Sequence, residues 1–253
     1  MRRLLALSLG EACCDKGSVL TPGHGDGQRI HIPICGFLLL TDGGRRVLID
    51  TGIHRDHVSD PDLTWRGTPT AEVLRPVMRI EDTVDYRLAA LGLRGTDITD
   101  VVNTHLHFDH AGNNDAFPNA TVHVQREQYE VALDNASFPN QYWRLAGVHF
   151  DLLDGESDLG DGLSVIPTPG HVPGHQSVLV QLESGQNIVI CGDAIYDQDN
   201  LGFEAWKGHM DPDQARSSAQ ILLDKARGLD ATVLYGHDRD QWSTVRKAPD
   251  YYE

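Results

Sequence analysis

The chain has 253 residues, 40% of them hydrophobic, with 25 glycines and 12 prolines and no break in composition, which predicts one globular domain over residues 1–253. Its formal net charge of -16 disfavours nucleic acid and anionic membrane surfaces as partners and is compatible with a neutral or weakly anionic small-molecule substrate. No stretch is apolar for long enough to cross a bilayer as a helix.

The beginning of the chain and its cysteines indicate a cytoplasmic protein. Residues 2–9 carry two arginines and a short apolar run, but Glu11 interrupts the apolar residues, which favours a first strand over a signal peptide. None of the four cysteines has C-x-x-C spacing, and Cys191 lies in an apolar run typical of a buried residue. We therefore expect a reduced protein without a disulfide framework.

Strand-like runs dominate the first part of the chain. We predict three strands, the last two joined by a hairpin turn at Asp42-Gly43-Gly44: residues 4–9, 32–40 and 46–50. The polar residues 54–70 are predicted to form a long loop, and long loops in compact domains are often lids or binding loops. Residues 71–91 show helical spacing of apolar side chains in parts and are expected to be partly helical.

The densest chemical signal follows a short predicted strand at residues 100–103, in the run Thr104-His105-Leu106-His107-Phe108-Asp109-His110. Burying three imidazoles and a carboxylate together is costly unless each has a partner, and two divalent cations would supply partners for all four. His105 and His107 are two residues apart, so they point the same way in an extended segment. Asp109 and His110 follow where the chain is expected to turn into a helix, and there they diverge. One short loop is therefore predicted to serve two metal ions.

The rest of the chain continues the alternation of strands and helices. We predict five further strands: residues 120–124, 163–166, 177–182, 187–191 and 232–235. One helix is predicted over residues 127–133. A longer helix begins with the N-cap and N1 pair Asp211-Pro212 and ends at Ala226, with Gly228 just past its end. Residues 135–150 are predicted to be irregular. Sheets covered by helices are the expected architecture.

Every candidate ligand follows a predicted strand. Asp109 and His110 come after the strand at residues 100–103, and three more ligands come at or just after later strand ends: His171, Asp193 and His237. A glycine directly precedes each of these three, where it permits a sharp turn and a close approach of the backbone: Gly170, Gly192 and Gly236. We therefore predict that the ligands converge on one edge of the sheets.

Together these residues resemble the metallo-β-lactamase superfamily, because the His-x-His-x-Asp-His run, His171, Gly192-Asp193 and Gly236-His237 occur in the family's order. The resemblance covers nearly the whole chain and implies an αββα four-layer sandwich, in which two mixed sheets face each other and helices cover both outer faces. It also implies two metal sites that share Asp193 as a bridging ligand. The first site would hold its metal through His105, His107 and His171, and the second through Asp109, His110 and His237.

A closer similarity is to the N-acyl homoserine lactonase branch of this superfamily. It rests on residues 105–112, on residues 168–177 and on the run Gly192-Asp193-Ala194-Ile195-Tyr196. Tyr196, three residues after the bridging aspartate, is the most telling feature. Two early segments also look like that branch: Leu20-Thr21-Pro22-Gly23 and Asp50-Thr51-Gly52. Asn113 stands where the branch usually has glycine, a departure that concerns the turn after the metal-ligand run.

The branch implies a lactonase that opens the ring of N-acyl homoserine lactones and so quenches quorum signals. A hydroxide shared by two divalent ions would attack the lactone carbonyl. Tyr196 would donate a hydrogen bond to the carbonyl oxygen or the developing oxyanion, and Asp109 would pass a proton to the leaving alkoxide. Zn²⁺ is the expected metal, although iron, cobalt and manganese suit the same ligands. A homodimer is expected only because dimers are common among soluble proteins.

Other functions stay open at this point. Simple lactones such as γ-butyrolactone are the nearest alternative substrates, because the choice of chain length lies in the pocket loops. Thioester hydrolysis of the glyoxalase II kind is disfavoured by Tyr196 and by the short C-terminal region. The Asp-x-x-Tyr element disfavours a β-lactamase, and the complete ligand set disfavours a non-catalytic metal-binding protein.

Residues near the ligands are given supporting roles. His175 has no vacant ligand role and is predicted to be structural, and Asp50 is predicted to organise the loop beneath the metals through hydrogen bonds. Phe108 is expected either to wall the substrate pocket or to pack in the core, whereas Trp65 is expected to be a lid or core residue. The remaining histidines, among them His209, are expected to be structural or surface residues.

Overall fold

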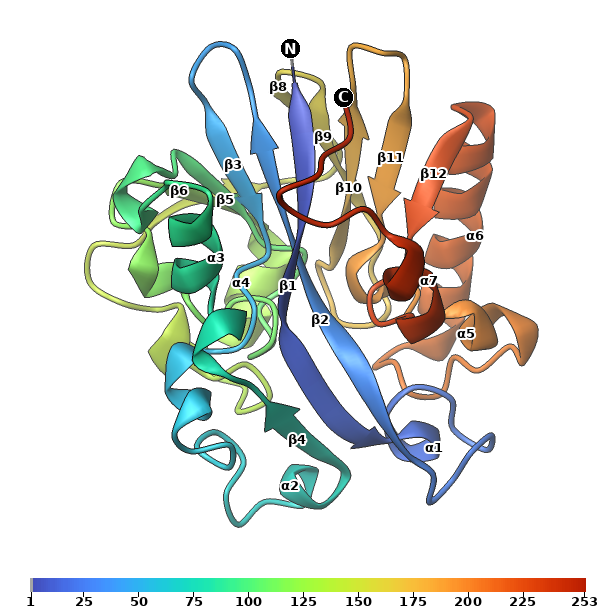
Figure 1. Ribbon diagram of the computed structural model, residues 1–253. Helices are drawn as coiled ribbons and strands as arrows, with labels where there is room; N and C mark the ends of the chain where they lie inside the picture. Colours follow the sequence, from blue (N-terminus) through green and yellow to red (C-terminus); the bar gives the residue numbers. More distant parts are fainter. Residues whose placement is uncertain (1) are drawn as a thin grey trace.

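The computed structural model describes residues 2–253 and contains two β-sheets packed face to face (Figure 1). The first sheet has the strand order β4-β1-β2-β3-β5-β6-β7, and the second has the order β12-β11-β10-β9-β8. The strands of the first sheet are β1 Arg3–Asp15, β2 Arg29–Leu40, β3 Arg46–Ile49, β4 Leu74–Val77, β5 Asp100–Val102, β6 Thr121–Gln125 and β7 His149–Leu153. Those of the second are β8 Ser157–Gly160, β9 Leu163–Pro167, β10 Gln176–Gln181, β11 Asn187–Ile190 and β12 Ala231–Leu234.

Both sheets are mixed, as the resemblance implies. In the first sheet, β1 to β4 pair antiparallel, and β3, β5, β6 and β7 pair parallel. In the second sheet, β11 and β12 are parallel while the remaining pairs are antiparallel. The helices are α1 Lys16–Val19, α2 Thr70–Val73, α3 Val84–Ala90, α4 Arg126–Ala132, α5 Gln198–Gly202, α6 Pro212–Gly228 and α7 Arg239–Thr244.

The core is layered because side chains alternate along each strand. Leu4 and Ala6 of β1 point between the sheets and pack with residues of the second sheet such as Val178, whereas Leu5 and Leu7 point outward. Helix α3 packs on that outward face of the first sheet. Helix α6 covers the outer face of the second sheet through its buried stripe Ala215, Ala219, Leu222 and Ala226 (Figure 1). The chain therefore forms the predicted αββα sandwich.

Helix α6 begins where the sequence predicts. The carboxylate of Asp211 accepts a hydrogen bond from the backbone N–H of Gln214, and Pro212 occupies the first helical position. The helix continues through Gly228 rather than ending at Ala226, so the predicted glycine stop lies in its last turn. The capping fixes the start of the helix, whereas the end of a helix commonly varies by one or two residues.

Three strands lie where the sequence predicts other structure. Strand β4 lies inside the segment expected to be partly helical, and β7 and β8 lie in or just after the segment expected to be irregular. Strand β1 is also longer than predicted, since it continues past residue 9 through a bulge between Ser8 and Glu11. Strands β4, β7 and β8 stand at sheet edges with one neighbour each, so few of their side chains are buried and the hydrophobic pattern is weak.

The helix expected at Asp109 and His110 is absent. The backbone carbonyl of His110 instead accepts hydrogen bonds from Thr51 N–H, from the Thr51 hydroxyl and from the Asn103 side-chain amide. A carbonyl occupied in this way is not available to the N–H four residues later, so the segment stays a series of turns. Within residues 2–253, no helix combines the length and hydrophobicity that crossing a membrane requires.

Candidate metal centre

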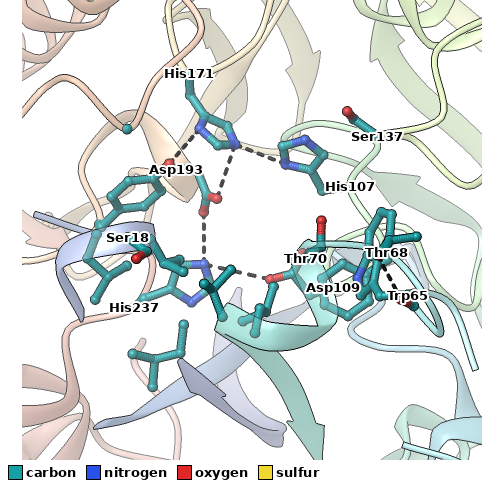
Figure 2. Close-up of a pocket in the computed structure, with 18 of the residues that line it drawn as sticks. Ser18, Trp65, Thr68, Thr70, His107, Asp109, Ser137, His171, Asp193 and His237 are labelled. Atoms are coloured by element: carbon teal, nitrogen blue, oxygen red, sulfur yellow. Dashed lines mark hydrogen bonds and ion pairs between the residues drawn. The ribbon is translucent and has the colours of Figure 1, made fainter. Parts of the chain in front are cut away.

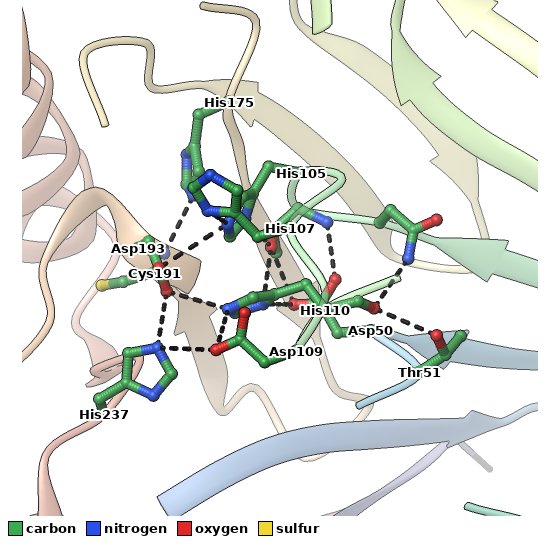
Figure 3. Close-up of polar contacts among 12 residues, drawn as sticks. Asp50, Thr51, His105, His107, Asp109, His110, His175, Cys191, Asp193 and His237 are labelled. Atoms are coloured by element: carbon green, nitrogen blue, oxygen red, sulfur yellow. Dashed lines mark hydrogen bonds and ion pairs between the residues drawn. The ribbon is translucent and has the colours of Figure 1, made fainter. Parts of the chain in front are cut away.

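The predicted ligands meet at one end of the sandwich, where four strands of the two sheets end (Figure 2 for His171, Figure 3 for the others). The loop after β5 carries the His-x-His-x-Asp-His run, and the loops after β9, β11 and β12 carry one ligand each: His171, Asp193 and His237. The imidazole nitrogens and carboxylate oxygens form two groups, each with its ligand atoms within 4.8 Å of one another. The first group is His105, His107, His171 and Asp193, and the second is Asp109, His110 and His237.

Asp193 connects the two groups. Its Oδ1 lies 3.2 Å from Nε2 of His110 and 3.2 Å from Nε2 of His237. Its Oδ2 lies 3.3 Å from Nε2 of His171 and 3.7 Å from Nε2 of His105. One carboxylate oxygen thus faces each group, which is the arrangement that a bridging ligand needs (Figure 3).

The cluster contains buried polar atoms that lack ordinary partners. Nε2 of His110 and Oδ1 of Asp193 are buried and form no hydrogen bond of good geometry. Nδ1 of His107 lies 2.9 Å from Nε2 of His105 and 3.0 Å from Nε2 of His171, so three ring nitrogens face one another. Buried polar groups need partners, and cations held between these atoms would supply them. Imidazole and carboxylate ligands in two adjoining sets therefore fit a pair of divalent metal ions.

The two groups differ in their protonation. Burial lowers the pKa of His107 to about 4 and holds the pKa values of His105 and His171 well below their usual range, so these rings are neutral at pH 7. Burial acts in the same direction on His110 and His237, but the carboxylates of the cluster outweigh it and raise the pKa of both rings. A metal ion entering the second group must displace these protons.

A second set of residues orients the ligands, as predicted for Asp50. The Asp50 carboxylate accepts hydrogen bonds of 2.8 Å from the backbone N–H and from the hydroxyl of Thr104, and another of 2.8 Å from Nδ1 of His110. Nδ1 of His237 donates to the backbone carbonyl of Pro33 at 2.9 Å. Because Nδ1 is held by these hydrogen bonds in both rings, Nε2 is the nitrogen that faces Asp193 and would bind a metal ion once its proton is displaced.

His175 lies beside the cluster but contributes to it indirectly, as expected. Its Nε2 accepts a hydrogen bond of 3.0 Å from the backbone N–H of Asp193, and its Nδ1 lies 2.9 Å from the Thr168 hydroxyl. Gly192 has a φ of 54°, and a Cβ at this position would lie 2.8 Å from Cβ of Thr104. The glycine before Asp193 thus permits the close approach that the sequence predicts.

A cavity of about 470 Å³ opens above the cluster (Figure 2). Its base is formed by His107, Asp109, His171, Asp193 and His237. Its walls are mostly apolar and come from the end of α1 and the next residue, from β2, the loop before α2, α2, β4 and the metal-ligand run: Val19, Leu20, Ile32, Trp65, Val73, Leu74 and Phe108. The rings of Trp65 and Phe108 meet edge to face at 5.6 Å. Phe108 therefore lies on the pocket wall, and Trp65, which we expected to be a lid or core residue, also lines the pocket.

Tyr196 stands at the edge of the first ligand group. Its hydroxyl lies 2.8 Å from Nδ1 of His171, and the side chain is buried. The sequence did not indicate that His209 lies here too. Its ring stacks on Tyr196 at 4.7 Å with an interplanar angle of 11°, and it meets His171 edge to face. The only signal is indirect: His209 lies two residues before the N-cap Asp211, whose N–H binds the carbonyl of Gly170 beside His171.

Comparison with known proteins agrees with this geometry. The family model described as the Metallo-beta-lactamase superfamily matches residues 36–237. The N-acyl homoserine lactonase AiiA of Bacillus thuringiensis subsp. kurstaki is 31% identical over 254 residues, covering 99% of this chain and 99% of the relative. The N-acyl homoserine lactonase AttM of Rhizobium radiobacter is 35% identical over 264 residues, covering 99% and 98%.

A solved structure gives the same result for the fold. An N-acyl homoserine lactone hydrolase with the product N-hexanoyl-L-homoserine bound at the catalytic metal center superposes with a TM-score of 0.92 and 30% identity, covering 99% of this chain and 98% of that one. The matches extend over both sheets and all four ligand-bearing loops. The chain therefore belongs to the metallo-beta-lactamase superfamily and, within it, to the N-acyl homoserine lactonase branch.

Proposed function

We propose that this chain is a dinuclear metal hydrolase that opens the lactone ring of N-acyl homoserine lactones. The observation that carries the proposal is that Asp109 of the second ligand group and Tyr196, which contacts His171 of the first, both line one largely apolar cavity. A homoserine lactone has a compact polar head and an apolar acyl chain. A polar base beneath apolar walls complements both parts.

The seven ligands would hold the metals in the two groups described, with Asp193 shared. When bound, two divalent ions supply the Lewis acidity that activates water and polarises an ester carbonyl at neutral pH. In the reaction, the oxygen of water bonds to the lactone carbonyl carbon, and the bond from that carbon to the ring oxygen breaks. The alkoxide formed takes up a proton, and the new carboxylic acid releases one.

Tyr196 is positioned to donate a hydrogen bond to the substrate. Nε2 of His171 faces the cluster, so Nδ1 carries the proton and donates it toward the Tyr196 oxygen at 2.8 Å. The Tyr196 hydroxyl keeps its own proton, because burial and the nearby Asp193 and Asp109 carboxylates raise its pKa well above the usual range. That proton points to the carbonyl oxygen as negative charge develops there.

Asp109 is proposed as the proton carrier. Its carboxylate lies 3.8 Å from Nε2 of His110 and 3.8 Å from Nε2 of His237, and it also lines the cavity. A carboxylate at this point takes the proton that the attacking water loses and returns it to the leaving alkoxide. Substitution of His107 or Asp193 is expected to remove metal and activity together.

The test is proton release by metal-loaded protein given N-hexanoyl homoserine lactone, with γ-butyrolactone and a thioester in parallel. Rapid opening of the acyl lactone is the expected result. Activity on γ-butyrolactone alone would assign the chain to simple lactones, and thioester hydrolysis alone would assign it to a glyoxalase II-like reaction. Neither result would support the role given to the acyl-chain walls.

We further propose Zn²⁺ as the resident metal and the cytoplasm as the location. Histidine and carboxylate ligands suit zinc, and all four cysteines are free thiols. Elemental analysis of protein purified from its native host tests the metal. Fractionation of the same cells tests the location, and sedimentation tests the expected homodimer.

A further inference from the structure

Two loops distant in sequence form the wall of the cavity opposite α1. The first mouth loop, residues 54–69, contributes Trp65 and Thr68, and the second mouth loop, residues 133–148, contributes Ala136 and Ser137 (Figure 2). Within residues 2–253, no backbone hydrogen bond joins these two loops. The direct hydrogen bonds between the loops therefore involve side chains.

A directed relay of hydrogen bonds crosses from one loop to the other. Nδ1 of His57 lies 3.0 Å from the backbone carbonyl of His54, and a carbonyl only accepts, so Nδ1 carries the ring proton. Burial lowers the pKa of His57, which keeps the ring neutral and leaves Nε2 as an acceptor. Nε2 accepts from the Thr64 hydroxyl at 2.9 Å, and the Thr64 oxygen then accepts from the Tyr142 hydroxyl at 2.8 Å. Each donor in the relay has one acceptor.

Ring packing supports the same connection. His54 stacks on Tyr142 with centroids 4.7 Å apart and an interplanar angle of 20°. His57 is fully buried at 0% exposure and touches the ring of Phe108, and Tyr142 is 6% exposed. His54 and His57 thus lie between Tyr142 of the second mouth loop and Phe108 on the cavity wall. The ring of Phe108 in turn meets the indole of Trp65.

We propose that the relay His57–Thr64–Tyr142 is a latch that holds the two mouth loops together and sets the affinity for the acyl chain of the substrate. The inference rests on the proposed function. A lactone held at the polar base leaves its acyl chain to the part of the cavity that Trp65, Leu74 and Ala136 border. Thr64 and Tyr142 act there as positioning residues, because they fix the wall without touching the reacting atoms.

The latch is tested with Tyr142→Phe, which removes the hydroxyl and keeps the ring that stacks on His54. We expect KM for N-decanoyl homoserine lactone to rise about fivefold, the equivalent of one neutral hydrogen bond, with kcat unchanged. KM for N-butanoyl homoserine lactone should stay unchanged. The matched control is Tyr129→Phe, since the Tyr129 ring packs on Trp143 and Phe150 and its hydroxyl forms no hydrogen bond within residues 2–253.

A second measurement separates the latch from the proposed function. Hydrogen exchange should accelerate in both mouth loops of Tyr142→Phe, although only the second loop carries the substitution, and Thr64→Val should give the same pattern. Exchange that rises in residues 133–148 alone, or KM values that rise equally for both lactones, would overturn the latch. If the wild-type protein opens neither lactone, the proposed function fails and hydrogen exchange alone decides on the latch.

Discussion

Asp193 and Tyr196 occupy one turn between β11 and α5, yet they have different surroundings. Asp193 faces both ligand groups through its carboxylate oxygens, whereas the hydroxyl of Tyr196 lies beside Nδ1 of His171 on the side away from the cluster. We propose that Asp193 holds metal and that Tyr196 contacts the substrate. Separate substitutions can distinguish these two roles.

Tyr196→Phe should retain both metal ions and lower turnover by about 10- to 100-fold, because the donor to the developing oxyanion is lost while every ligand stays. Metal content and kcat measured on the same preparation check this. Tyr235→Phe is the control, since Tyr235 is only half-buried and lies outside the cavity lining. Equal turnover of wild type and Tyr196→Phe would remove this residue from the mechanism.

Asp50→Asn should weaken the second metal. Asp50 has a φ of 56°, which asparagine tolerates, so the backbone is kept. The new amide group would present N–H to Nδ1 of His110 and favour the wrong ring tautomer. We expect metal affinity to fall about 10- to 100-fold, measured by competition with a chelator. An unchanged affinity would mean that the hydrogen bond to His110 has no orienting role.

For individual residues, the sequence predicts the candidate metal ligands but not the aromatic side chains that stack on the site. Chain order and spacing indicate His105, His107, Asp109 and His110, because these four candidate metal ligands lie within six positions of the chain. His209 contacts Tyr196, and Phe138 stacks on His107 at 4.8 Å, only because separate loops fold over the site. Such contacts have no fixed spacing along the chain, so no sequence pattern reveals them.

In the turn after the metal-ligand run, the side chain of Asn113 connects this run to the segment that follows β3. Asn113 donates from its amide to the backbone carbonyls of Thr51 and Ile53, both at 2.8 Å, and accepts from the N–H of Arg55 at 3.0 Å. It therefore ties the ligand run to the chain that leaves β3. This explains how an asparagine serves where the branch usually has glycine.

Asn113→Gly should lower the free energy of unfolding by about 2–3 kcal/mol, because three hydrogen bonds, two of them fully buried, are lost and glycine adds backbone freedom. Chemical denaturation checks this value, and metal content should not change. Asn119→Gly is the control, since Asn119 makes a single exposed hydrogen bond to Thr96. Equal stability of Asn113→Gly and wild type would show that the tie contributes nothing.

Strands with a strong apolar pattern were predicted to within a few residues, and so was the edge strand β12, whereas the edge strands β4, β7 and β8 were not. Strands β2 and β10 bury most of their side chains, so their hydrophobic runs are plain in the sequence. Strand β8 alternates partly buried and exposed side chains and reads as loop, although it pairs with β9. Its pairing is decided by a neighbouring strand, which the local sequence does not describe.

A network of largely buried charged and polar side chains, formed by Arg45, Asp100 and His123, connects neighbouring strands of the first sheet. The Asp100 carboxylate accepts from Arg45 at 2.8 and 2.9 Å and lies 2.9 Å from Nε2 of His123. Burial raises the pKa of Asp100, but these hydrogen bonds outweigh burial and hold its pKa well below the usual range. Stability from this carboxylate is thus complete above about pH 4 and is lost as the pH falls below it.

Asp100→Asn should lower the free energy of unfolding at pH 7 by about 1.5–3 kcal/mol, as expected for lost hydrogen bonds to a charged group. The variant should also lose less stability than wild type between about pH 4 and pH 2. Denaturant titrations at several pH values measure both effects, with the exposed Asp134→Asn as control. Parallel pH curves for wild type and Asp100→Asn would contradict this assignment.

The fold class of the whole molecule could be predicted, because the order of the ligand motifs along the chain resembles that of a known superfamily. The packing of one sheet on the other through Leu4, Val178 and their neighbours becomes visible only in three dimensions. That packing brings ligands from four separate loops together. One domain over residues 1–253 stays a prediction, and limited proteolysis followed by unfolding tests it.

We propose that two metal ions act together in lactone opening. The most direct test adds Zn²⁺ stepwise to metal-free protein and follows the rate at which N-hexanoyl homoserine lactone is opened. Because the structure has two ligand groups, we predict that the rate rises until two equivalents are bound and then stays level. A rate that is already maximal at one equivalent, or that is equally high without metal, would contradict the account.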